Sequence, residues 1–169
     1  MEDLLAGLAP YFGQVSYVVR DMDSALGWFK PVFGVKYFGV TEFDLGPEMN
    51  LKVKGVPSQF KIKLALGYYG ANGEWELELI QPLSGMGPHM EHLNNHGPGL
   101  HHVAFFVPDF DAWAKRFIDS GCQMVLEGQT PDVHFAYFDC RTNQGAFVEL
   151  TQFSAAGLES NNLLKTPPK

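Results

Sequence analysis

The chain has 169 residues, a net charge of −7 and 46% hydrophobic residues. This apolar content is enough to build the core of one domain, which argues against an intrinsically disordered chain. The acidic balance disfavours nucleic acid and anionic membrane surfaces as the main partner, because both repel negative charge.

We expect no targeting segment at the N-terminus. Residues 1–5 carry acids where a secretory signal carries positive charge, and no apolar run approaches the ~20 residues that cross a bilayer. Cys122 and Cys140 are too few for a disulfide framework, so we expect two buried reduced thiols. These features predict a soluble cytoplasmic protein.

The first half of the chain predicts the order strand, helix, strands. In the strand at residues 14–19, Val15, Tyr17 and Val19 form one apolar face, because side chains alternate between the faces of a strand. A helix follows at the capping residues Asp23 and Ser24. Two further strands, before and after residues 70–73, form a hairpin, because the Asn-Gly pair in this turn supplies positive φ.

The second half predicts the same order of elements. Residues 84–98 are rich in Gly, Pro, Asn and His and form a linker with one short helix around residues 90–93. A strand, a helix capped by Asp109 and Asp111, and a strand pair come next, with the turn of that pair at residues 141–145. The final segment, residues 154–169, is polar, and we expect a mobile or surface-draped tail.

An internal repeat relates the two halves. Residues 14–23 align with residues 102–111, and residues 78–81 align with residues 149–152. The sequence therefore predicts one domain over residues 12–153. Its two modules cover residues 12–83 and 99–153, and the linker joins them.

The repeat places a polar residue between apolar neighbours at four matched positions, Gln14, Glu78, His102 and Glu149. Two buried carboxylates close together are costly, and a cation would resolve that cost. One imidazole, two carboxylates and one amide oxygen suit Zn²⁺, Ni²⁺, Co²⁺, Fe²⁺, Mn²⁺ or Mg²⁺. Taken singly, each residue is more often a surface or edge residue. The repeat is what favours a shared metal site.

These residues resemble the vicinal oxygen chelate superfamily, also called the glyoxalase/bleomycin-resistance/dioxygenase fold. The most specific stretch is GLHHVAF at residues 99–105, which is similar to methylmalonyl-CoA epimerases. The resemblance implies an α+β fold of two βαβββ modules whose strands form curled mixed sheets around a metal-containing cleft. It also implies a homodimer. The other matching stretches are residues 14–23, 25–34, 75–82, 106–111 and 135–152.

In that superfamily the metal ligands come from the first and last strands of each module, which places them here on Gln14, Glu78, His102 and Glu149. His102 is chosen because it aligns with Gln14, and we expect His101 to face away from it. The order Gln, Glu, His, Glu resembles the zinc type of glyoxalase I. The epimerases more often have His first and Gln second, and ring-cleaving dioxygenases have a His where Gln14 stands.

The chemistry that the resemblance implies is stabilisation of an enolate by a divalent ion. A carboxylate beside the ion would move the proton, with Glu149 as the first candidate base and Glu78 as the second. We therefore expect an isomerase, epimerase or lyase acting on a small oxo or acyl substrate. Two alternatives stay open: a non-catalytic binding or sequestration protein of the same fold, and a non-haem iron dioxygenase.

The remaining histidines give weaker signals. His134 could act as an extra acid or base, but a surface or core histidine is the better interpretation of it. His89, His92 and His96 lie in the linker, where we expect a solvated loop.

Overall fold

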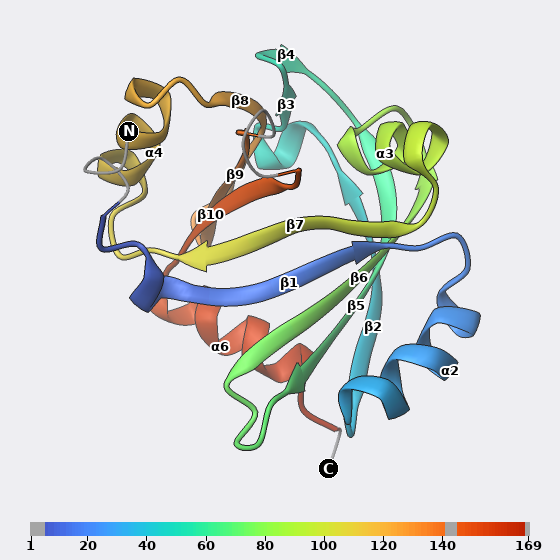
Figure 1. The fold of residues 1–169 in the computed structure, drawn as a ribbon. Coiled ribbons are helices and arrows are strands. Elements are labelled where there is room, and N and C mark those ends of the chain that lie inside the picture. Colours follow the sequence, from blue (N-terminus) through green and yellow to red (C-terminus); the bar gives the residue numbers. More distant parts are fainter. Residues whose placement is uncertain (1–5, 141–144, 168–169) are drawn as a thin grey trace.

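The computed structural model describes residues 6–140 and 145–167 and confirms an α+β fold of two modules (Figure 1). The first module contains β1 (Phe12–Val18), α2 (Met22–Phe33), β2 (Phe38–Leu45), β5 (Phe60–Tyr69) and β6 (Trp75–Ser84). Between β2 and β5 the chain forms two short strands, β3 (Lys52–Val53) and β4 (Val56–Pro57).

The second module comes after a linker that carries α3 (Pro88–His96), so the short helix expected there is confirmed and is longer than expected. The module contains β7 (Gly99–Phe106), α4 (Phe110–Asp119), β8 (Gln123–Gln129), β9 (Val133–Asp139) and β10 (Phe147–Phe153). The turn expected between the last two strands lies mostly outside the described residues, because residues 141–144 are not among them.

The strands form one curled mixed sheet in the order β2-β5-β6-β1-β7-β10-β9-β8-β3-β4. The two modules meet where β1 pairs antiparallel with β7, and we call this line the β1–β7 seam. Across it, Gln14 pairs with Ala104 and Ser16 pairs with His102. In the sequence repeat, Gln14 is equivalent to His102 and Ser16 is equivalent to Ala104. The two pairs across the seam are therefore related by the repeat, because each residue of one pair has its equivalent in the other.

The helices begin where the sequence provides a side-chain acceptor. Asp21 accepts a hydrogen bond from the Ser24 amide, and Asp109 accepts one from the Ala112 amide. The first helix therefore starts slightly earlier than its predicted cap at Asp23. The repeated glutamines have matching roles: Gln81 accepts a hydrogen bond from the first amide of α2, and Gln152 accepts one from the first amide of α4.

The two helices cover one face of the sheet with apolar side chains. Met22 and Phe29 of α2 pack in one cluster with Leu77 and Leu79 of β6. The equivalent cluster on α4 contains Trp113, Phe117, Phe138 and Leu150. Because side chains alternate along a strand, Glu76 and Glu78 then face the other, concave side of the sheet. Among the described residues, no helix is long and apolar enough to cross a membrane.

The cysteine prediction is wrong, because Cys122 and Cys140 form a disulfide. Gln123 pairs with Asp139 across β8 and β9, so the residues just outside this pair are brought together. Their Cα atoms are 4.8 Å apart. The spacing of the two cysteines in the sequence does not show how β8 and β9 pair, so it could not predict the disulfide.

The C-terminal segment also differs from the expected tail, because residues 155–164 form α6 (Ala155–Leu164). This helix contacts both β10 and β2, and so reaches from one module to the other (Figure 1). A Cβ at Gly157 would clash with the backbone carbonyl of Asp132, so only glycine allows this close approach. Lys165, directly after the helix, is 4% exposed.

Candidate metal centre

The concave side of the sheet holds a cavity of about 200 Å³ between the two modules. Most of its wall is apolar and comes from β5, β6, β8 and β9, among them Leu64, Leu66, Ile80, Leu126 and Phe135. The polar groups that line it include Gln14, Glu76, Glu78, Glu149 and Thr151. A few polar groups in an apolar cavity are typical of a small-molecule site.

Three of the four predicted ligands meet at the wall of this cavity, where Glu78 and Glu149 line it and His102 lies against both of them. The Nε2 atom of His102 lies 2.8 Å from Oε2 of Glu149 and 3.2 Å from Oε2 of Glu78. The His102 side chain is fully buried, and those of Glu78 and Glu149 are 10% and 12% exposed. The sheet explains this meeting, because β6 and β10 flank the central pair: β6 pairs parallel with β1, and β10 pairs parallel with β7.

The contacts within this group are short but lack hydrogen-bond alignment. Buried Nε2 of His102 and buried Oε2 of Glu78 have no hydrogen-bond partner in the described part of the chain. Unpartnered buried polar atoms are costly, and a divalent ion would satisfy both at once. One imidazole and two carboxylates, with ligand atoms within 4.8 Å of one another, therefore fit a divalent metal ion.

The charges around His102 affect its protonation. Burial alone would lower the pKa of His102, but the adjacent carboxylates of Glu149 and Glu78 outweigh burial and raise the pKa to about 9. Without an ion, His102 is therefore protonated at neutral pH and balances one of the two carboxylates. An ion that binds Nε2 must displace this proton.

Gln14 lines the same cavity, but its amide nitrogen donates a hydrogen bond to Oε2 of Glu76, 3.3 Å away. The other oxygen of Glu76 is in a buried ion pair with Lys165 and accepts a hydrogen bond from Asn161. Burial raises the pKa of Glu76, and Lys165 opposes that rise. The role of Gln14 as a fourth ligand stays a prediction.

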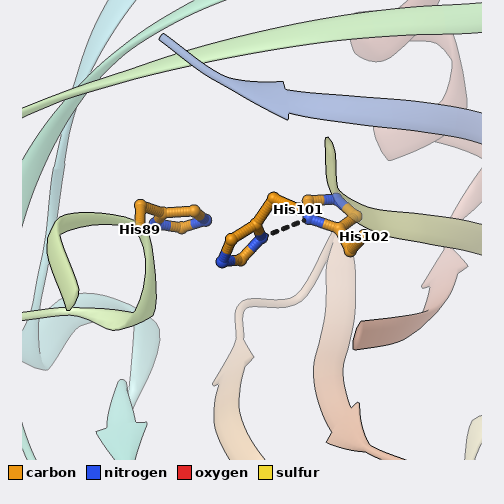
Figure 2. Close-up of side chains that lie close together, drawn as sticks. All are labelled: His89, His101 and His102. Atoms are coloured by element: carbon orange, nitrogen blue, oxygen red, sulfur yellow. Dashed lines mark hydrogen bonds between the residues drawn. The ribbon is translucent and has the colours of Figure 1, made fainter. Parts of the chain in front are cut away.

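His101 does not face away from His102, although the alternation of strand side chains predicts that it should. Its Nδ1 atom lies 2.9 Å from Nδ1 of His102 (Figure 2). The register across the β1–β7 seam shifts at this point, since Ser16 pairs with His102 and Tyr17 pairs with Leu100. His101 is therefore the extra residue of a β-bulge, and a bulge interrupts the alternation.

The linker histidines do not form one solvated loop. His89 in α3 is 1% exposed, and its Nε2 lies 3.1 Å from the hydroxyl of Tyr137. Burial and the nearby His102 lower the pKa of His89 to about 3. His96 is exposed, as expected. His134 stacks on Phe110, with ring centroids 3.5 Å apart, and does not line the cavity.

Sequence reasoning missed two groups beside the site. Ser16 pairs with both Glu78 and His102 in the sheet, and its fully buried hydroxyl has no hydrogen-bond partner in the described residues. Its position on the same strand face as Gln14 was the available signal. Tyr137 pairs with Glu149, and its ring centroid lies 4.6 Å from that of His102.

Comparisons with known proteins agree with this architecture. The family model described as "Glyoxalase/Bleomycin resistance protein/Dioxygenase superfamily" matches residues 13–138. No curated protein matches the sequence.

Solved structures with a similar fold include methylmalonyl-CoA epimerases. The enzyme from Mycobacterium tuberculosis is 21% identical, with a TM-score of 0.64, and the match covers 92% of this chain and 95% of that one. A hypothetical protein from Bacillus halodurans is 20% identical, with a TM-score of 0.61 and coverage of 85% and 94%. The epimerase from Streptomyces coelicolor is 17% identical, with a TM-score of 0.59 and coverage of 86% and 98%.

At these identities the solved structures establish the fold alone. The family model spans most of the chain, and the two modules and the buried Glu–His–Glu group occur where the sequence repeat predicts them. The chain therefore belongs to the glyoxalase/bleomycin resistance protein/dioxygenase superfamily.

Proposed function

We propose that this protein is a divalent-metal-dependent isomerase, epimerase or lyase that acts through an enolate of a small oxo or acyl substrate. The observation that carries this proposal is the group of Glu78, His102 and Glu149, whose ligand atoms lie within 4.8 Å of one another at the wall of a cavity that both carboxylates line. The epimerase names of the solved structures with a similar fold support the same reaction class.

The bound ion would supply the positive charge that stabilises an enolate oxygen. His102 would hold the ion through its unprotonated Nε2, together with the carboxylates of Glu78 and Glu149. Glu149 is the proposed base, because the Thr151 hydroxyl donates a hydrogen bond of 2.7 Å to its Oε1 and so orients the carboxylate. Glu78 is the second candidate base. With both acting on one planar enolate the outcome is epimerisation, and with one acting alone it is isomerisation.

The cavity also favours a substrate with an apolar body. Of the described residues that line it, none is Lys or Arg, and Lys165 just outside is paired with Glu76. The bound ion would therefore be the main positive charge available to a negatively charged group on the substrate. Substrates whose acyl or oxo part is small and hydrocarbon-rich fit this environment.

The test is exchange of a substrate α-proton with solvent. The purified chain is loaded separately with Zn²⁺, Ni²⁺, Co²⁺, Mn²⁺ or Mg²⁺ and incubated in D₂O with small 2-oxo, 2-hydroxy and acyl-thioester compounds. We expect NMR to show deuterium at the α-carbon of one class. We also expect Glu149→Gln to fold normally and to lose at least ~100-fold in rate. Glu127→Gln, outside the cavity, is the matched control. Full activity in Glu149→Gln would remove Glu149 from the mechanism.

The two alternatives give different results in the same preparation. A chain that binds no divalent ion but takes a hydrophobic ligand would be a binding or sequestration protein, a possibility that the mostly apolar wall favours. A chain that requires Fe²⁺ and consumes oxygen would be a dioxygenase. Either result would overturn the enolate proposal.

A further inference from the structure

The β-bulge in β7 brings two consecutive histidines into contact on the side of His102 that faces away from the carboxylates. His102 has two ring nitrogens, and they have different neighbours. Nε2 faces Glu78 and Glu149. Nδ1 lies 2.9 Å from Nδ1 of His101, on the other side of the ring (Figure 2). His101 is thus the group that sits behind the proposed ligand atom.

Binding of an ion would determine which of the two histidines donates the hydrogen bond between them. A histidine binds a metal ion through a nitrogen that carries a lone pair, so Nε2 of His102 must be unprotonated. The ring proton is then on Nδ1, and Nδ1–H donates to His101. For His101 to accept it, its own Nδ1 must be unprotonated and its proton must be on Nε2.

Packing holds the His101 ring in place. The residue is 1% exposed, and its ring centroid lies 4.8 Å from that of His89, 5.0 Å from that of Phe147 and 5.2 Å from that of His92. Because the His101 ring is packed on several sides, its Nδ1 atom is held in a fixed position relative to the His102 ring.

We propose that His101 is a positioning residue that accepts a hydrogen bond from Nδ1–H of His102 and thereby keeps Nε2 of His102 directed between Glu78 and Glu149. This inference rests on the proposed function, since it assigns His101 a role in holding the same ion. It also gives the bulge a purpose, because a regular strand would place His101 on the opposite face.

The experiment measures Zn²⁺ affinity by competitive titration with a chelator. His101→Asn keeps an acceptor, because its Oδ1 is as many bonds from the backbone as Nδ1 of histidine. His101→Leu removes the acceptor. We expect His101→Leu to weaken Zn²⁺ binding by ~10–100-fold, which is the loss seen when such hydrogen-bond partners are removed at other metal sites. We expect the affinity of His101→Asn to stay within about threefold of wild type, because the acceptor is kept. His96→Leu, which changes an exposed histidine of the same helix, is the matched control and should bind as wild type does.

A second readout needs no substitution. In the Zn²⁺-loaded wild type with ¹⁵N-labelled histidine, we expect a through-bond coupling between Nδ1 of His102 and Nδ1 of His101, with the proton on His102. A proton on Nδ1 of His101, or no coupling, would overturn the proposal even if the His101→Leu variant does not fold.

The outcomes separate the two proposals. If wild type binds no divalent ion, the proposed function fails and the role of His101 fails with it. If wild type binds Zn²⁺ and His101→Leu binds it equally well, only the role of His101 fails. If wild type binds two ions and His101→Asn binds one, then His89, His101 and His102 hold a second ion, and the hydrogen-bond role is again refuted.

Discussion

Gln14 and Glu76 lie opposite each other on β1 and β6, and the side-chain amide of Gln14 donates a hydrogen bond to the Glu76 carboxylate. Because the nitrogen of the amide is engaged, its oxygen remains as the atom that could bind an ion. If Gln14 is a ligand, Gln14→Ala should weaken Zn²⁺ binding by about tenfold. Glu149→Gln should weaken it by ~100-fold, because it also removes a charge. Competitive titration measures both, and wild-type affinity in Gln14→Ala would exclude Gln14 from the ligand set.

Removal of Lys165 should destabilise the protein by about 3 kcal/mol, because Glu76 would keep a buried charge without its partner. The measurement is urea unfolding of Lys165→Met against wild type. The matched control is Lys165→Met combined with Glu76→Gln, which removes both charges and should recover much of the loss. If the single and double variants lost the same free energy of unfolding, the unpaired charge of Glu76 would not be the cause of the loss.

The metal-free protein should lose stability as the pH rises. The pKa of His102 is raised from 6.5 to about 9 in the folded state, so its contribution is fully present below about pH 6.5 and is lost as the pH rises through about 9. The free energy of unfolding of wild type, compared with that of His102→Gln, should therefore fall between these values. His96→Gln changes an exposed histidine and should behave as wild type does. A constant difference between wild type and His102→Gln would contradict this pKa.

The disulfide predicts that the unreduced, unfolded chain has no thiol that reacts with an alkylating reagent. Reduction, or Cys122→Ser with Cys140→Ser, should cost about 3 kcal/mol, since the bridge closes a loop between residues separated by 18 positions. Thermal unfolding with and without reductant measures the loss. Two reactive thiols in protein purified without reductant would instead support the reducing cytoplasm that the sequence predicted.

Local periodicity and the internal repeat were enough to predict the two modules and the close approach of Glu78, His102 and Glu149. Alternation in β1 and β6 indicated which face is apolar, and the repeat made Glu78 equivalent to Glu149 and His102 equivalent to Gln14. Neither signal could predict contacts that depend on strand register. The pairing of Gln123 with Asp139 brings the cysteines together, and one extra residue in β7 turns His101 toward His102.

The C-terminal helix was missed for another reason. Its sequence has few large apolar residues, so periodicity gives little signal. Its position depends on specific partners that lie far away in the sequence, such as Glu76 for Lys165 and Tyr68 for Asn162. Such partners become visible only once the sheet has brought them together.

An ion between Glu78 and Glu149 would connect β6 and β10, which belong to different modules and have the β1–β7 seam between them. It would cross-link the two modules at the β1–β7 seam. Because an ion that binds only the assembled site adds its binding free energy to folding, occupancy would tighten this junction and suppress independent opening of either half. Hydrogen exchange in the four central strands would then report directly on whether the metal is in place.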